Sequence, residues 1–261
     1  MQDLGFDYTY DKTLYDKLVG RDAPGTQSHL LGLPPGALAS GAHFLENHDE
    51  PRIASLLSPA EHRAAALLIL ALPGLRFLHE GQLSGARTKL PVQLLRRPCE
   101  ISNLKSEIQP LPSQISNPKS EIQRPPFQIS NPKSEIQPPP LDPLYDQLLT
   151  ILPATAVGDG LAELLRPRAA WAENPTFQKM IVIQWQKDAP DFDLAVVNLA
   201  PHRSQCYAPP TLSNLSAHNW SMKDLLGAEQ YERDGDDLQA QGLYLDLPPY
   251  GAQLFHFTPI S

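Results

Sequence analysis

The sequence has few cysteines, an excess of acidic over basic residues and no long apolar run. Its 261 residues include two cysteines, and 21 Lys and Arg stand against 29 Asp and Glu, giving a formal net charge of −8. A chain this acidic is a poor match for nucleic acid, because phosphate binding needs clustered Lys and Arg. No stretch reaches the roughly 18 apolar residues of a membrane span, and the first residues lack the basic start and apolar core of a secretion signal. We therefore expect neither nucleic acid nor membrane as a partner.

The two cysteines, Cys99 and Cys206, lie far apart and lack the spacing of metal ligands. Two reduced thiols are the simplest interpretation, and they favour a reducing compartment. The carboxylates of residues 234–237 lack the spacing of a calcium-binding EF-hand loop and predict a solvated turn. We therefore expect a cytoplasmic protein without metal or cofactor, with the reservation that residues ahead of Met1 would hide any signal.

The first part of the chain alternates between strand and helix patterns. Short apolar or aromatic segments at 4–9, 42–45 and 75–78 predict strands, and the segments 11–18 and 58–72 between them predict helices. Ser58-Pro59-Ala60-Glu61 has the pattern of a capping box with proline in the first turn. Residues 20–41, rich in Gly, Pro and Ser, predict a loop with at most one helical turn. This order is typical of an α/β fold with a parallel sheet, but a closed barrel needs about eight strands.

Residues 98–143 have a different composition from the rest of the chain. A nine-residue motif, Ile-Ser-Asn-Leu/Pro-Lys-Ser-Glu-Ile-Gln, begins at 101, 115 and 129. The period of 14 fits two heptads, but the many prolines in and between the copies exclude a continuous coiled coil. Low apolar content and near-identical copies predict a disordered insertion in a surface loop.

The remainder of the chain changes from a helix to strands. Residues 144–152 carry one apolar stripe and predict a helix, and residues 166–176 predict a linker. Apolar segments at 180–185 and 194–199 predict sandwich strands. The alternating segment 243–247, a Pro-Pro-Tyr-Gly turn and the segment 254–257 together predict a β-hairpin.

An apolar segment ends abruptly in polar residues at positions 44–52, Phe-Leu-Glu-Asn-His-Asp-Glu-Pro-Arg. Its pattern Phe-x-x-Asn-His-Asp resembles the signature at the seventh barrel strand of the α-amylase superfamily of glycoside hydrolases. Residues 73–82, Pro-Gly-Leu-Arg-Phe-Leu-His-Glu-Gly-Gln, look like that superfamily's next strand, although Arg76 stands where the common pattern has proline.

The resemblance implies an α/β fold with an incomplete (β/α)8 TIM barrel followed by an all-β sandwich. Residues 1–97 would hold the last three βα units, and residues 98–143 the disordered repeat insertion. Residues 144–170 would form the last barrel helix and a linker, and residues 171–261 the C-terminal β-sandwich domain. The substrate would be an α-glucan or α-glucoside, cleaved with retention; whether water or a second sugar accepts the glycosyl group stays open.

Retaining cleavage of a glycosidic bond uses two carboxyl groups, a nucleophile and a general acid/base. The resemblance implies that Asp49 is a third, assisting carboxylate of the catalytic site and that His48 binds sugar hydroxyls. Asn47 would precede them in the substrate site and shape the loop. Arg52 would orient Asp49 or ligand oxygens, or else lie on a helix surface. A helix cap for Asp49 and an ordinary histidine at 48 are the structural alternatives.

The superfamily's nucleophile lies in a Gly-x-Arg-x-Asp pattern after the fourth barrel strand, and its acid/base glutamate after the fifth. No Gly-x-Arg-x-Asp occurs in these 261 residues. We therefore expect a chain that is inactive alone and that pairs with an N-terminal polypeptide completing the barrel. The alternative is a non-catalytic carbohydrate-binding or interaction protein derived from the same fold. Glu80 and Gln82, after the last strand, are expected in a solvated loop.

Overall fold

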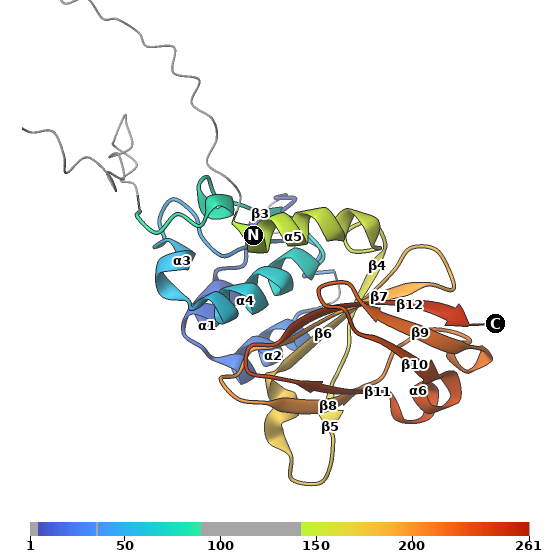
Figure 1. Ribbon diagram of the computed structural model, residues 1–261. Coiled ribbons are helices and arrows are strands. Elements are labelled where there is room, and N and C mark those ends of the chain that lie inside the picture. The colour runs from blue at the N-terminus through green and yellow to red at the C-terminus, as the bar shows by residue number, and fades with distance from the viewer. Residues whose placement is uncertain (1–4, 35, 90–141, 261) are drawn as a thin grey trace, which may run out of the picture. The chain divides into compact units, whose positions relative to one another are not determined.

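The computed structural model describes residues 5–34, 36–89 and 142–260. The disordered repeat block predicted at 98–143 lies outside the described residues, apart from its last two positions. Cys99 also lies outside them. The described residues all belong to one compact unit (Figure 1).

Three short strands form a parallel sheet, as the strand–helix alternation predicts. Strand β1 (Thr9–Tyr10) pairs with β2 (Gly41–Phe44), which pairs with β3 (Leu75–Phe77), and both pairings are parallel. Because the strands are parallel, their C-terminal ends share one edge of the sheet. Among the described residues, β1 and β3 each pair along one edge only.

The segments that connect and follow these strands form helices (Figure 1). They are α1 (Lys12–Val19), α2 (Ala23–Gly32), α3 (Ile53–Leu56), α4 (Pro59–Ala71) and α5 (Pro143–Ile151), with short 3-10 turns η2 (Gln82–Ser84) and η3 (Leu152–Ala154). The predicted capping box of α4 is present: the Ser58 hydroxyl accepts from the Glu61 amide, and the Ser58 amide donates to the Glu61 carboxylate at 2.8 Å.

Helix α2 corrects the loop predicted for residues 20–41. The Asp22 carboxylate accepts a hydrogen bond from the Gly25 amide, and Pro24 lies in the first turn, where its missing N–H costs nothing. Leu30 and Thr26 are buried against the rest of the unit. The Gly, Pro and Ser content indicated a loop, although Asp22 and Pro24 form a common type of helix N-terminus.

The rest of the described chain is a two-sheet β-sandwich. The larger sheet has the order β10-β9-β12-β7-β6-β4 and the smaller one β11-β8-β5, with antiparallel pairing throughout. The strands are β4 (Leu161–Leu164), β5 (Arg168–Ala169), β6 (Met180–Gln186), β7 (Phe192–Asn198), β8 (Ser204–Ala208), β9 (Asn219–Asp224), β10 (Gln230–Asp234), β11 (Leu243–Leu247) and β12 (Ala252–Ile260). Turns η4 (Pro175–Lys179) and η5 (Leu215–Ala217) and helix α6 (Gly235–Gln241) connect them.

Two sequence predictions about the sandwich differ from the structure. The segments 243–247 and 254–257 do not form a hairpin, because β11 pairs with β8 in the small sheet and β12 pairs with β7 and β9 in the large one. Strict alternation identified the buried side of β11 but not its partner strand. The sheets also begin at Leu161, ahead of the predicted start at 171, and β5 lies within the predicted linker.

The large sheet is buried on both faces. Ile181, Ile183 and Trp185 of β6 belong to the core shared with the helices, whereas Met180 and Val182 point into the sandwich core. Helix α4 packs on β7 and β12, and the Trp185 indole N–H donates to the carbonyl of Ala71 at 2.7 Å. Burial on both sides explains the unbroken apolar runs at 180–183 of β6 and 194–197 of β7.

Across residues 5–34, 36–89 and 142–260, no helix combines the length and the apolar character that crossing a membrane requires.

Candidate functional site

The polar cluster of residues 44–52 leaves the C-terminal end of β2, the central strand of the parallel sheet. Phe44 and Leu45 are buried, and the polar residues Glu46 and Asn47 that follow are buried as well. His48 and Asp49 then turn outward, with 54% and 75% of their side chains exposed. Their side chains are 3.3 Å apart, between His48 Nε2 and Asp49 Oδ2. The structure thus brings an imidazole and a carboxylate together at the edge where barrel enzymes carry their active sites.

Asn47 shapes the turn that presents these two side chains. Its buried amide oxygen accepts hydrogen bonds from the backbone N–H groups of Asp49 at 2.9 Å and Glu50 at 3.0 Å. Asparagine is well suited to this position, because its short side chain bonds to the backbone two residues ahead. The oxygen that could otherwise meet a ligand is occupied within the loop.

A buried ion pair holds the base of the loop. The Arg52 Nη1 donates to Glu46 Oε1 at 2.8 Å, and the other Glu46 oxygen accepts from the Ile53 amide at 2.7 Å. Both side chains are almost wholly buried, at 4% and 1% exposure. The sequence analysis missed Glu46, although an acid within an apolar run and six residues before an arginine was a signal for such a pair.

Arg52 also connects this loop to the one that follows β3. Its guanidinium donates to the Glu80 carbonyl and contacts the Nδ1 of His79 at 3.0 Å. Burial and the Arg52 charge together lower the pKa of His79. These contacts differ from both expected roles of Arg52, because the guanidinium points into the protein and is directed neither at Asp49 nor along a helix surface.

Gln82 corrects the expectation of a solvated loop after β3. It is buried, and its Nε2 donates to the Tyr145 hydroxyl of α5 at 2.8 Å. The same hydroxyl lies 2.9 Å from Nε2 of His62 on α4, so one buried network joins turn η2 to two helices. Burial lowers the pKa of His62. Glu80, by contrast, has a largely exposed side chain.

One face of the parallel sheet carries aromatic rings from all three strands, and Phe44 there also stacks on Tyr15 of α1. Tyr10, Phe44 and Phe77, one from each strand, have ring centroids 5.1 to 6.5 Å apart. Tyr10 is 51% exposed and Leu75, on the same face, is 43% exposed. Exposed large apolar side chains on one sheet face are typical of a surface that another part of a protein covers.

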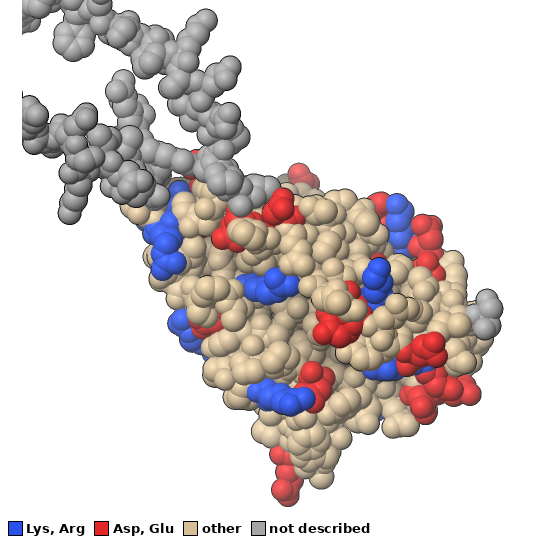
Figure 2. All heavy atoms as spheres, viewed as in Figure 1, with Lys and Arg blue, Asp and Glu red and all other residues tan. Residues whose placement is uncertain are grey.

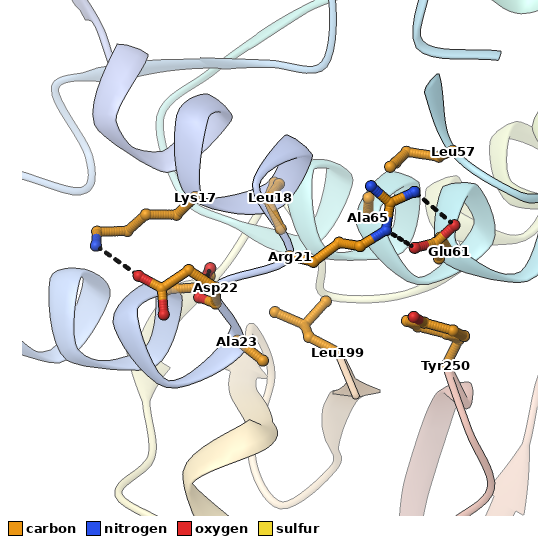
Figure 3. A pocket seen from close by; sticks show the side chains of 11 residues that line it. Lys17, Leu18, Arg21, Asp22, Ala23, Leu57, Glu61, Ala65, Leu199 and Tyr250 are labelled. Carbon is orange, nitrogen blue, oxygen red and sulfur yellow. Dashed lines mark hydrogen bonds and ion pairs between the residues drawn. The ribbon is translucent and has the colours of Figure 1, made fainter. Parts of the chain in front are cut away.

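A small cavity of about 20 Å³ lies where α1, α2 and α4 meet the sandwich (Figure 3). The ion pair between Arg21 and Glu61 closes one side, and Leu199 and Tyr250 come from the sandwich. Burial opposes ionisation of Glu61, but hydrogen bonds from Arg21 and Ser58 lower its pKa to about 2. The cavity holds about one water molecule and lies apart from His48 and Asp49, so we assign it to packing.

The described residues offer no cluster of three or more His, Cys, Asp or Glu side chains that could hold a metal ion. Cys206 is a free thiol in the sandwich core, and burial raises its pKa to about 12. His48 and Asp49 can form hydrogen bonds to hydroxyl groups, and the Asp49 carboxylate can stabilise a nearby positive charge.

Neither a family model nor a curated protein matches this sequence. Among solved structures, the noncanonic maltogenic alpha-amylase AmyB from Thermotoga neapolitana is similar to 98% of this chain and covers it with 52% of its own length, at 15% identity and a TM-score of 0.57. The alpha-amylase from H. orenii is similar to 97% of this chain over 49% of its own, at 18% identity and a TM-score of 0.54. Identities this low establish the fold alone: this chain has the fold of about half of an alpha-amylase-type glycoside hydrolase.

Proposed function

We propose that this chain supplies one side of a retaining site that acts on α-glucans or α-glucosides. Asp49 is the assisting carboxylate, which grips sugar hydroxyls and stabilises the positive charge that develops on the sugar ring. His48 binds hydroxyls of the sugar whose bond breaks. Asn47 and Arg52 act as positioning residues, Asn47 through the turn and Arg52 through Glu46 and the loop after β3.

One observation carries the proposal. A parallel sheet presents the adjacent pair His48 and Asp49 from the C-terminal end of its central strand, on a loop fixed by a buried ion pair. Sites on parallel α/β sheets lie at that edge. The exposure of both side chains fits a site whose opposite wall other residues provide.

In this proposal, the nucleophile and the acid/base residue lie outside these 261 residues. They would come from the missing strands of a (β/α)8 barrel, carried by an N-terminal polypeptide that pairs with the edges of β1 and β3. The exposed side chains of Tyr10 and Leu75 support this, since a completed barrel would bury that face. Without the nucleophile and the acid/base, no positive charge develops on the sugar for Asp49 to stabilise. The chain alone therefore cannot lower the reaction barrier by the roughly 8–23 kcal/mol that enzymes achieve.

Two measurements on the purified chain test the proposal. Maltotriose should shift the NMR signals of the His48 ring, and Asp49→Asn should weaken that response. His202→Gln, which removes an exposed histidine of the sandwich, serves as the control and should leave the response intact. Unchanged His48 signals at saturating sugar would contradict the assignment of this site.

The second measurement is turnover of maltoheptaose. We expect none from the chain alone, and turnover once a polypeptide with Gly-x-Arg-x-Asp and the downstream glutamate is added. Asp49→Asn should then lower kcat by about 10²–10³-fold, the loss typical of one charge-stabilising group. Sugar binding with no turnover in any mixture would instead favour the non-catalytic carbohydrate-binding protein.

A further inference from the structure

The outer face of the small sheet carries two tyrosines side by side. Tyr207 of β8 and Tyr244 of β11 are directly opposite each other in the antiparallel register, with ring centroids 5.5 Å apart and planes at 57°. Their neighbours along each strand, Cys206 and Leu245, point inward to the sandwich core. Tyr244 is 42% exposed and Tyr207 partly exposed, so both rings face solvent rather than the core.

Polar groups surround the tyrosine pair. Arg168 of β5 lies opposite Tyr207 in the register, and its guanidinium donates to the Gln241 carbonyl at 2.8 Å. In the next row of the same face, Asp246 accepts hydrogen bonds from Arg203 at 2.6 and 2.8 Å and from Gln205 at 3.2 Å. The outward positions of β8 and β11 thus hold rings, amides and charges, and no aliphatic side chain.

A hollow of about 410 Å³ opens beside the pair, and both tyrosines line it. Its opposite wall comes from β10 and α6, whose exposed carboxylates include Glu232, Asp234 and Asp237. Figure 2 shows acidic side chains gathered at this end of the molecule, where α6 lies in Figure 1. Arg233 is the lining residue with a positive charge, so the hollow repels phosphates and disfavours nucleic acid.

We propose that this surface, the tyrosine pair with its acidic hollow, is a second carbohydrate-binding site that takes an uncharged α-linked glucan chain. A sugar ring has an apolar face, which an aromatic ring can cover, and hydroxyls at its rim, which carboxylates and amides can accept. Few other uncharged ligands combine an apolar face with a rim of hydroxyl groups. Two rings at 57° follow a chain that curves from one residue to the next, as α-linked glucans do, better than a flat β-linked chain.

The sugar class rests on the proposed function, whereas the position of the surface does not. Asp49 lies on the loop after β2 and the tyrosines lie on the small sheet of the sandwich. The surface would hold a long glucan while one of its ends reaches the site at β2, and so raise the local concentration of substrate.

Titration of the whole chain with maltoheptaose, followed in amide NMR spectra, tests the inference. Signals of residues 205–208 and 243–246 should shift, and the double variant Tyr207→Ala/Tyr244→Ala should bind at this surface at least about tenfold more weakly. Tyr244→Phe keeps the ring and should bind within about twofold of the unaltered chain. Thermal unfolding of each variant checks that the sandwich is intact.

Two further experiments distinguish a failure of the site at β2 from a failure of the surface on the sandwich. Asp49→Asn should leave the shifts at 205–208 and 243–246 unchanged, so a failed site at β2 and a failed surface on the sandwich give different results. Cellohexaose, a β-linked glucan, should bind clearly more weakly than the α-linked maltohexaose of the same length, and equal binding would overturn the α-linked assignment. A folded double variant that binds like the unaltered chain, or no shifts with either sugar, would overturn the surface itself.

Discussion

The two sheets that lie nearest the helices differ in how they are covered. The six-stranded sheet packs helices on one face and the small sheet on the other, and its central strands β6 and β7 are buried almost throughout. The three-stranded parallel sheet carries the exposed side chains of Tyr10 and Leu75 on one of its faces, beside the buried ring of Phe44. Parallel sheets in proteins are usually covered on both faces. The contrast indicates that the sandwich side of this unit is complete in itself and the parallel sheet is not.

The largest loss of stability is expected from breaking the buried Arg52–Glu46 ion pair at the base of the loop after β2. Arg52→Met leaves the Glu46 carboxylate buried without its partner, and breaking a buried pair costs about 3–5 kcal/mol. Urea unfolding measures the loss. Lys187→Met, which breaks the exposed pair with Asp159 in the sandwich, is the control and should leave the midpoint unchanged. A loss for Arg52→Met as small as the control's would mean that the loop after β2 does not depend on this pair.

The next comparison removes an apolar side chain from each sheet. Ile183→Ala opens a cavity in the doubly covered sheet and should cost about 2–5 kcal/mol. Leu75→Ala trims an exposed side chain of the parallel sheet and should change the free energy of unfolding by about 0.5 kcal/mol or less. If Leu75→Ala instead cost as much as Ile183→Ala, that face would already be covered in solution, for example by a second copy of the chain.

Features that depend on neighbouring residues could be predicted from the sequence, whereas features that depend on distant residues could not. Parallel order, the α4 capping box and the strands at β2, β3, β6 and β7 follow from local patterns, since hydrophobic period and caps are read from neighbouring residues. The partners of β11 and β12 could not be predicted, because register and sheet membership depend on residues far along the chain. Helix α2 was missed because Gly and Pro at its start and end mimic a loop.

The candidate site divides in the same way. His48, Asp49 and Asn47 stand out in the sequence as a cluster, and the structure keeps them together on one loop. The direction of Arg52 does not follow from spacing, since its partners Glu46 and Glu80 depend on how two loops meet in space. The tyrosine surface is still harder to predict: Tyr207 and Tyr244 are 37 positions apart and become neighbours only through β8–β11 pairing.

The smallest effects should come from two histidines with opposite responses to pH. On the large sheet, the Asp193 carboxylate raises the pKa of His256, 2.8 Å away, despite burial and the charge of Lys223. A raised pKa adds stability that is complete below the unfolded value, about 6.5, and is lost as the pH rises through the folded value. His256→Gln should therefore lower the free energy of unfolding at pH 6 more than at pH 8.

On the parallel sheet, burial lowers the pKa of His43, despite the nearby Asp11 carboxylate and the carbonyls of Leu38 and Pro73. Because the unfolded chain then binds the proton more readily, stability is lost as the pH falls below about 6.5. His43→Gln should remove part of that acid sensitivity, so its effect shrinks toward low pH while that of His256→Gln shrinks toward high pH. Urea midpoints of both variants between pH 5 and 8 measure this, and parallel curves for the two would mean that one of the histidines is solvated rather than held as described.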